Sequence, residues 1–250
     1  MTAPRDGAGA DDDDAARPED GASAARRRQV AADYDAGAAG YDARHGDRVS
    51  LARGRILDAP LVDAARGAAK VLELGVGTGR LLAQLEAPTR AGVDIAAAML
   101  ARARARDPRL LLAVADAAQL PFADESFDAV LAGKGVLRYL DPDRALAEAA
   151  RVLRPGGALA VHLYGARTWT LVGRRPTPAP GRWELASTDD LVDRAAAHGL
   201  SATAVHRYRP IRLPPYLLPI PACLDRRLPA QLWGHCVAVF RRDRGHASQA

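Results

Sequence analysis

The sequence predicts an α/β fold built on a doubly wound, mostly parallel sheet. Two observations carry this prediction. Short apolar segments and helical patterns alternate five times between Val71 and Val161, which is typical of parallel βαβ units. The first apolar segment runs directly into the glycine-rich turn Gly75–Gly79, and such a turn builds a small-molecule crevice at the carboxyl edge of a parallel sheet. A chain of 250 residues is long enough for one domain with a full core.

The chain is expected to begin with a disordered segment, residues 1–25. The folded domain should follow over residues 26–243. Residues 1–25 hold alanine, glycine, proline and acids without apolar periodicity, so they cannot bury enough surface to offset the entropy of ordering. A helical lead-in should follow over 28–41, and a helix over 49–65 has apolar residues at helical spacing and should pack on the sheet. The tail, 244–250, is again expected to be disordered.

The central part should supply five strands, each short and apolar, that lie within residues 71–74, 91–95, 110–117, 127–130 and 158–161. Helical patterns between them cover residues 80–85, 96–106 and 147–153. The last of these helices ends in Arg151-Val152-Leu153-Arg154-Pro155-Gly156-Gly157. Basic residues there favour the negative end of the helix dipole, proline stops the helix, and the two glycines turn the chain into the fifth strand.

The C-terminal part should add one helix and two strands, over residues 188–197, 202–208 and 232–240, with Gly199 as the C-cap of the helix. Residues 210–229 contain six prolines and are therefore unsuited to a helix or a central strand. A long irregular loop is often functional. This segment and residues 164–180 are expected either to wall a ligand pocket or to be surface insertions.

The glycine turn indicates which ligand the crevice takes. Glycine allows a positive φ and a close approach of the backbone to a ligand. The dinucleotide fingerprint is G-x-G-x-x-G, whereas here the third glycine comes one residue early and Glu73 precedes the turn, giving E-x-G-x-G-x-G. This spacing points to a nucleoside ligand without a pyrophosphate.

The turn resembles the first motif of the class I S-adenosylmethionine-dependent methyltransferases. Two further segments are similar to phrases typical of that family: Leu120-Pro121-Phe122 with Ser126-Phe127-Asp128, and the run from Arg151 to Gly157. The resemblance covers residues 34–163 in detail and the rest to about 243 more loosely, and it is strongest to the small-molecule branch (type 11, ubiquinone-biosynthesis-like). It implies a Rossmann-like seven-stranded sheet of order 3-2-1-4-5-7-6 with the last strand antiparallel, and S-adenosyl-L-methionine as the cofactor.

The resemblance also assigns a cofactor site. Asp94, at the end of the second strand, would accept hydrogen bonds from the ribose hydroxyls, or it simply caps the next helix. Asp116 would accept from the adenine amine while the N–H of Ala117 donates to the ring; the alternative is a turn-capping role. Tyr41 would belong to a lid over the cofactor, or only pack. The predicted cofactor site is Tyr41, Glu73, Gly75, Gly77, Gly79, Asp94, Ile95, Met99, Asp116, Ala117 and Lys134.

The implied activity is in-line transfer of a methyl group to an O, N or C nucleophile of a small molecule. Such a displacement needs mainly a nucleophile held in line, and a base only for an acceptor of high pKa. No catalytic residue is assigned. Weak candidates are His162, Tyr139 and Arg138, whereas His206 and His235 are expected farther from the crevice. Asn and a His pair are common in the family where this chain has Lys134, Arg138 and Tyr139, so the acceptor stays open.

Two other classes share some of these features. A nicotinamide-dependent dehydrogenase would have the strand, the glycines and Asp94, but the early third glycine and the downstream segments argue against it. A cofactor-binding but inactive partner or scaffold protein would keep Glu73 and the glycines and lose the acceptor pocket.

Composition narrows the partners. The net charge is +5, but the arginines are scattered among acids and aromatic residues make up only 5%, so no nucleic-acid binding is expected. No apolar run is long enough to span a membrane, and no signal peptide is seen. Cys223 and Cys236 form no metal-ligand spacing and are expected to be reduced, which suits a cytoplasmic protein. The sequence does not specify an oligomeric state.

Overall fold

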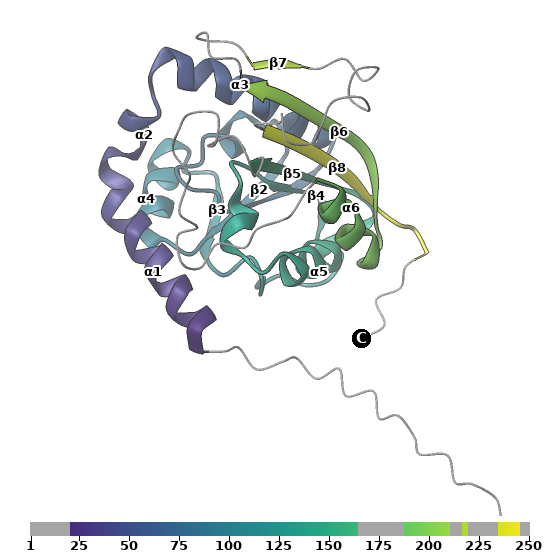
Figure 1. The fold of residues 1–250 in the computed structure, drawn as a ribbon. Helices are drawn as coiled ribbons and strands as arrows, with labels where there is room; N and C mark the ends of the chain where they lie inside the picture. The colour runs from purple at the N-terminus through teal and green to yellow at the C-terminus, as the bar shows by residue number, and fades with distance from the viewer. Residues whose placement is uncertain (1–20, 165–187, 211–216, 220–234, 246–250) are drawn as a thin grey trace, which may run out of the picture.

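The computed structural model describes residues 21–164, 188–210, 217–219 and 235–245. Within them, eight strands form one sheet of order β3-β2-β1-β4-β5-β8-β6-β7, with helices on both faces (Figure 1). The strands are β1 (Lys70–Leu74), β2 (Thr89–Asp94), β3 (Leu111–Val114), β4 (Phe127–Ala132), β5 (Leu153–Tyr164), β6 (Leu200–Pro210), β7 (Leu217–Pro219) and β8 (His235–Arg242).

The sheet confirms the predicted topology. Strands β1 to β5 pair in parallel, and β8 lies antiparallel between β5 and β6. Because β6 and β8 are the predicted sixth and seventh strands, the order of those seven is 3-2-1-4-5-7-6. The short strand β7 is additional and pairs with the end of β6. It comes from the proline-rich segment and lies at the sheet edge, where proline is tolerated. Most of that segment, and of 164–180, lies outside the described residues.

The helices are α1 (Gly21–Gly37), α2 (Tyr41–Arg44), α3 (Arg48–Ala64), α4 (Ala97–Arg106), α5 (Pro142–Val152) and α6 (Thr188–Ala197), with 3₁₀ turns η1 (Ala38–Gly40), η2 (Leu82–Gln84) and η3 (Val136–Tyr139). Successive residues of β1 point to opposite faces. Val71 packs in the apolar cluster that contains residues of α3 and α4, and Leu72 in the cluster that contains residues of α5 and α6. Both faces of the sheet are therefore buried, as is typical of parallel sheets.

Three predicted boundaries differ from the structure. Helix α1 begins at Gly21, so residues 21–25 belong to it, while residues 1–20 and 246–250 lie outside the described residues. The helix predicted over 80–85 is only the 3₁₀ turn η2, because β2 already begins at Thr89, directly after Pro88. Helix α5 begins at Pro142, earlier than predicted, because the Asp141 side chain accepts from the N–H groups of Asp143 and Arg144 and caps it.

The Arg-Pro-Gly-Gly segment is the fourth difference. The structure places it inside β5 rather than before the strand. The pairing with β4 shifts register there: Phe127 faces Leu153 and Ala129 faces Ala158. Gly156 has a φ of +80°, so it supplies the irregular backbone conformation that the shift requires. In the described part of the chain, no helix has the length and apolar character needed to cross a membrane.

Candidate functional site

The three glycines of the turn after β1 all have positive φ: +62° at Gly75, +54° at Gly77 and +73° at Gly79. A Cβ on Gly75 would collide with the Val136 side chain, and a Cβ on Gly79 would come within 3.0 Å of Ala103. A Cβ on Gly77 would meet nothing within 4 Å. Gly75 and Gly79 are thus also required by close packing, whereas Gly77 leaves the open space that a nucleoside needs to approach the backbone.

Asp94 joins this turn to the start of α4. Its Oδ2 accepts from the N–H of Gly77 at 2.8 Å, and its Oδ1 accepts from the N–H of Ala96 at 2.9 Å. Burial raises the pKa of the carboxyl group, and the backbone donors oppose that shift. Asp94 therefore binds the backbone at the start of α4, which agrees with the prediction that it caps this helix, although the N-cap residue itself is Ala96.

Glu73 lies beneath the turn and is only 4% exposed. Its Oε2 accepts from the N–H of Leu82 at 3.1 Å. Burial raises the pKa of Glu73 to about 8, an effect that Lys134 opposes and Asp58 reinforces. Asp58 of α3 is also buried, and burial raises its pKa too. Two carboxyl groups with an elevated proton affinity thus lie next to the glycine turn.

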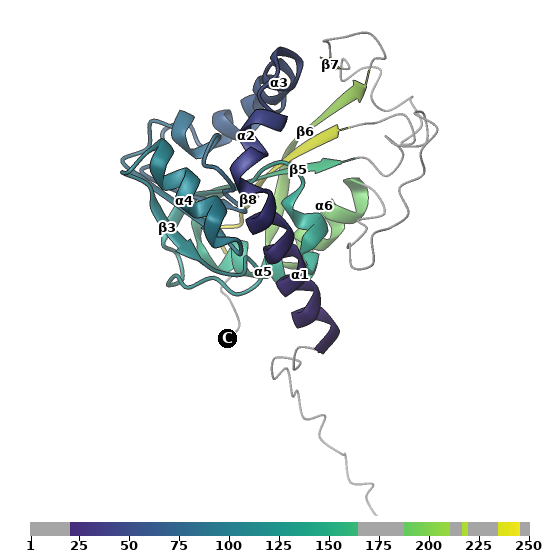
Figure 2. The ribbon, with the colours of Figure 1, turned by 90° about the vertical axis from the view of Figure 1, so that its left-hand side faces the viewer.

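The N-terminal helices cross the carboxyl edge of the sheet (Figure 2). Arg27 of α1 forms an ion pair with Asp116 at 3.1 Å, beyond the end of β3. Asp35 accepts from the N–H of Ala98 in the first turn of α4 at 2.8 Å. Helix α2 continues this cover, since Asp42 accepts from the Thr78 hydroxyl within the glycine turn at 2.8 Å. The predicted lid is therefore in contact with the predicted cofactor crevice.

The other predicted cofactor residues lie along the same edge. Ala117 and Met99 are buried, and Met99 packs with Ala38 and Ala96 against Tyr41. Ile95 is half-buried and follows Asp94. Among the predicted cofactor residues, Tyr41 and Lys134 also line a separate cavity, described next, whereas the glycines and the three acids do not line it.

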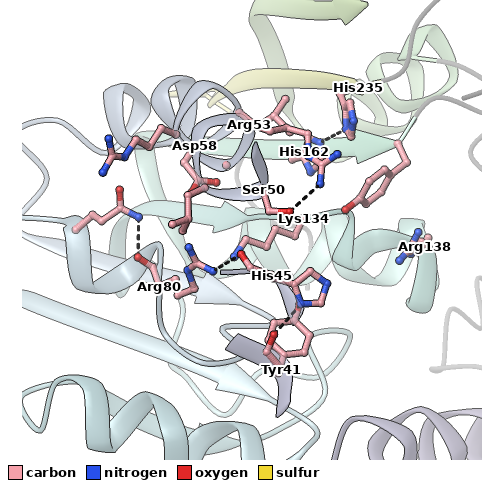
Figure 3. A pocket seen from close by; sticks show the side chains of 16 residues that line it. Tyr41, His45, Ser50, Arg53, Asp58, Arg80, Lys134, Arg138, His162 and His235 are labelled. Carbon is pink, nitrogen blue, oxygen red and sulfur yellow. Dashed lines mark hydrogen bonds between the residues drawn. The ribbon is translucent and has the colours of Figure 1, made fainter. Parts of the chain in front are cut away.

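A cavity of about 700 Å³ opens between α3 and the carboxyl ends of β4 and β5 (Figure 3). Helix α3 contributes one wall, and β5 and β8 contribute the other. Its lining residues are Tyr41, His45, Ser50, Leu51, Arg53, Gly54, Arg55, Leu57, Asp58, Arg80, Gln84, Lys134, Arg138, His162, Tyr164 and His235. This volume lies within the range of pockets that enclose small organic ligands.

Two histidines meet in the wall of this cavity. The Nε2 of His162 and the Nδ1 of His235 are 3.1 Å apart, and the rings are stacked. The pKa of His162 is lowered to about 3, mainly by burial and in smaller part by His235, Arg138 and Lys134. The pKa of His235 is lowered to about 4, mainly by burial and in smaller part by Arg53. Both rings are therefore neutral near pH 7, so one donates its N–H and the other accepts.

This pair corrects the expectation that His235 lies farther from the crevice, since His235 lines the cavity beside His162. The antiparallel pairing of β5 with β8 sets Tyr164 opposite His235 and brings His162 next to it. That register is the signal that could have found the pair. His206 is exposed on β6 and does not line the cavity, as expected.

Arg138 and Tyr139, in η3, have different surroundings. The Arg138 guanidinium lies over the rings of Tyr139 and Tyr164, at 4.9 and 4.7 Å from their centroids, and lines the cavity. Tyr139 does not line it; its hydroxyl accepts from the Tyr34 hydroxyl of α1 at 3.2 Å. Lys134, between Gly133 and Gly135, has a φ of +49°, an unusual conformation for a residue with a side chain.

The described residues include no group of three or more His, Cys, Asp or Glu side chains arranged to hold a metal ion. Cys236 is buried in β8. Cys223 lies outside the described residues.

Comparisons with known proteins agree with this geometry. Residues 72–161 match the methyltransferase domain family. A demethylmenaquinone methyltransferase of Beutenbergia cavernae is 39% identical over 145 residues, 56% of this chain and 60% of the relative. A malonyl-[acyl-carrier protein] O-methyltransferase of Methylococcus capsulatus is 37% identical over 151 residues, 57% of this chain and 54% of the relative. The chain thus spans about three fifths of the length of such curated relatives.

Solved structures show the same fold. A methyltransferase of Thermotoga maritima, described as a possible histamine N-methyltransferase, superposes with a TM-score of 0.61 at 21% identity and covers 89% of this chain and 100% of its own. The [4+2]-cyclase SpnF gives 0.63 at 23% identity, covering 88% and 97%. A cyclase on this fold means that the fold alone does not fix the reaction. The sequence match, the glycine turn and the sheet order nevertheless agree: residues 72–161 match the methyltransferase domain family, and the sheet that contains them has the strand order expected for that fold.

Proposed function

We propose that this chain binds S-adenosylmethionine along the carboxyl edge of β1 to β3 and transfers its methyl group to a small molecule held in the neighbouring cavity. The observation that carries the proposal is the glycine turn itself. Gly77 faces open space while its N–H is held by Asp94, so the backbone is fixed and approachable at one point. The cavity, which Tyr41 and Lys134 line, continues from that edge.

The residues that follow β2 and β3 at this edge suit the two parts of a nucleoside, the ribose and the base. Asp94 keeps further acceptor capacity for ribose hydroxyls, because a carboxylate has about four acceptor sites and two are used by backbone N–H groups. Asp116 and Ala117, beyond β3, are assigned to the adenine. When bound, the cofactor supplies an activated methyl group on a sulfonium. The chain's own task is then to hold the acceptor in line and exclude water.

The cavity wall offers hydrogen-bonding groups to the acceptor. An imidazole of the neutral His162–His235 pair can hold a hydroxyl or amine by a hydrogen bond, but burial lowers the pKa of these rings to about 3 and about 4, so both are weak bases near pH 7. The acceptor atom itself, O, N or C, is not assigned. A cavity of this size also separates the proposal from an inactive partner protein, which would not need an acceptor pocket.

Calorimetric titration with S-adenosylmethionine, S-adenosylhomocysteine and NADH tests the cofactor assignment. We expect micromolar binding of the first two and none of NADH. Asp94→Ala should weaken binding by about 1–3 kcal/mol, the cost of removing a charged hydrogen-bond partner. Asp63→Ala is the matched control, since that carboxylate is exposed and pairs only with Arg66 among the described residues. Unchanged affinity in the Asp94 variant would overturn the assignment of this crevice.

A further inference from the structure

The charged residues that line the cavity are strongly unbalanced. Among the described residues that line it, five are cations, namely Arg53, Arg55, Arg80, Lys134 and Arg138, and one is an acid, Asp58. Burial raises the pKa of Asp58, which weakens its negative charge further. These residues leave a clear excess of positive charge, and the stacked pair His162 and His235 is neutral.

The cations nearest the histidines lack acidic partners. Among the described residues, no carboxylate lies within ion-pair distance of Arg53, Lys134 or Arg138. The one described polar contact of the exposed Arg53 side chain is a 3.5 Å hydrogen bond to Ser50. Arg138 donates one N–H to the Tyr139 hydroxyl at 2.9 Å, and its Nε is buried without a hydrogen-bond partner. Arg90 and Arg151, by contrast, are paired with carboxylates, with Asp107 at 2.8 Å and with Asp124 at 2.7 Å.

These groups surround one end of the cavity. Arg138 lies over the ring of Tyr164, and that ring lies 5.0 Å from the ring of His162. Arg53 is close enough to His235 and Tyr164 to act on both groups: it adds to the lowering of the His235 pKa by burial, and it opposes the rise that burial causes in the pKa of Tyr164. Arg80 stays apart, next to the glycine turn, where it donates to the His45 carbonyl. One end of the cavity therefore combines two guanidinium groups that have no carboxylate partner among the described residues, an imidazole pair and an aromatic ring (Figure 3).

A guanidinium presents several donors in one plane and matches a carboxylate, which has acceptor oxygens only. A buried donor without a partner costs free energy until a ligand supplies an acceptor. Unpaired positive charge in a cleft also concentrates anions there.

We propose that the acceptor is an organic acid whose ionised carboxylate is bound by Arg53 and Arg138, with an apolar ring or chain against Tyr164. This inference rests on the proposed methyl transfer and names the substrate class for the same site. The carboxylate anchors the molecule, and the methylated atom is another atom of it, because a carboxylate held by two guanidinium groups is a weak nucleophile.

The test compares acids with amides of the same shape on the full chain, with and without saturating S-adenosylhomocysteine. The probes are benzoate against benzamide, and indole-3-acetate against indole-3-acetamide, titrated to millimolar concentration with saturation-transfer NMR as the readout. We expect each acid to bind at least about 10-fold more tightly than its amide, the size of one charge-assisted hydrogen bond. The variants Arg53→Gln and Arg138→Gln should each reduce this preference, and the double variant should abolish it.

Arg104→Gln is the matched control, since Arg104 is exposed on α4, does not line the cavity and loses the same charge. The affinity for S-adenosylhomocysteine should stay within about twofold in all variants, which also shows that they fold. Failure of that ligand to bind the wild type would refute the cofactor assignment and leave the acid–amide comparison readable. Equal binding of acids and amides, no acid binding at millimolar concentration, or a preference that survives in the double variant would overturn the inference.

Discussion

At the scale of single residues, Glu73 is unusual because its ionisable side chain is buried. It ends its strand with a carboxyl group that is almost fully buried and makes one described hydrogen bond, to the N–H of Leu82. Burial raises its pKa from the ordinary value of 4.5 to about 8. A carboxyl group with a raised pKa binds its proton more tightly in the folded state, so its ionisation lowers stability as the pH rises between these two values.

Glu73→Gln should therefore stabilise the free protein at alkaline pH. The amide keeps an acceptor for Leu82 and cannot ionise. We expect the unfolding temperature of the variant to exceed that of the wild type near pH 8 by roughly 2–10 °C, which corresponds to about 1–3 kcal/mol for a chain of this size. The advantage should shrink near pH 5, where Glu73 is protonated in the folded state. Thermal melts across this range check it, with exposed Glu86→Gln as the control. An advantage that does not grow with pH would contradict a buried, protonated Glu73.

Residues whose roles depend on local backbone geometry were predictable. The three glycines take the positive φ that their spacing indicated, and Asp94 holds the turn from the end of its own strand. The His162–His235 contact was not predictable from spacing, because it joins residues far apart in sequence through the register of β5 with β8. Long-range register depends on the whole sheet and not on any one segment.

At the scale of elements, α1 is held on the sheet edge mainly by polar contacts. Arg27 pairs with Asp116, Tyr34 donates to Tyr139, and Asp35 accepts from the first turn of α4. Its apolar contact is a small cluster in which Tyr34 packs near Met99. Partly exposed pairs of this kind contribute about 1 kcal/mol or less each. The helix can therefore separate from the edge at small cost, which a lid over a ligand requires.

Arg27 occupies the carboxylate that the proposed function assigns to the adenine. Arg27→Gln should remove this competition and strengthen binding of S-adenosylhomocysteine by about 1.5- to 5-fold, the range that a partly exposed ion pair of up to about 1 kcal/mol allows. Calorimetry of the variant beside Arg104→Gln, which loses the same charge at an exposed position of α4, measures this. Weaker binding in the Arg27 variant would mean that Arg27 contributes to the ligand site and does not compete for Asp116.

At the scale of the whole molecule, the core and the site are separate. Two apolar clusters fill the two faces of the sheet, one beneath α3 and α4 and the other beneath α5 and α6. The glycine turn, Asp94, Asp116 and α1 lie at the carboxyl edge (Figure 2). The core was predictable because alternating strands and helices have few stable arrangements. The position of α1 over the sheet edge was less predictable, because it depends on polar contacts between segments that are distant in sequence.

This separation predicts where a cofactor should change hydrogen exchange. S-adenosylhomocysteine at about 100 times its Kd stabilises the folded state by about 2.7 kcal/mol and therefore slows every amide that exchanges through global unfolding. The comparison accordingly uses amides that exchange through local opening, which slow only where that opening disrupts the site. We expect protection in α1, in Gly75–Arg80 and at the start of α4, because α1 closes on the ligand that the turn binds. Helices α5 and α6 pack on the face of the sheet opposite to α3 and α4, and they serve as the internal control. Equal protection of α5 and α6 would indicate binding elsewhere. Protection of the turn without α1 would show that α1 is a fixed part of the edge and not a lid.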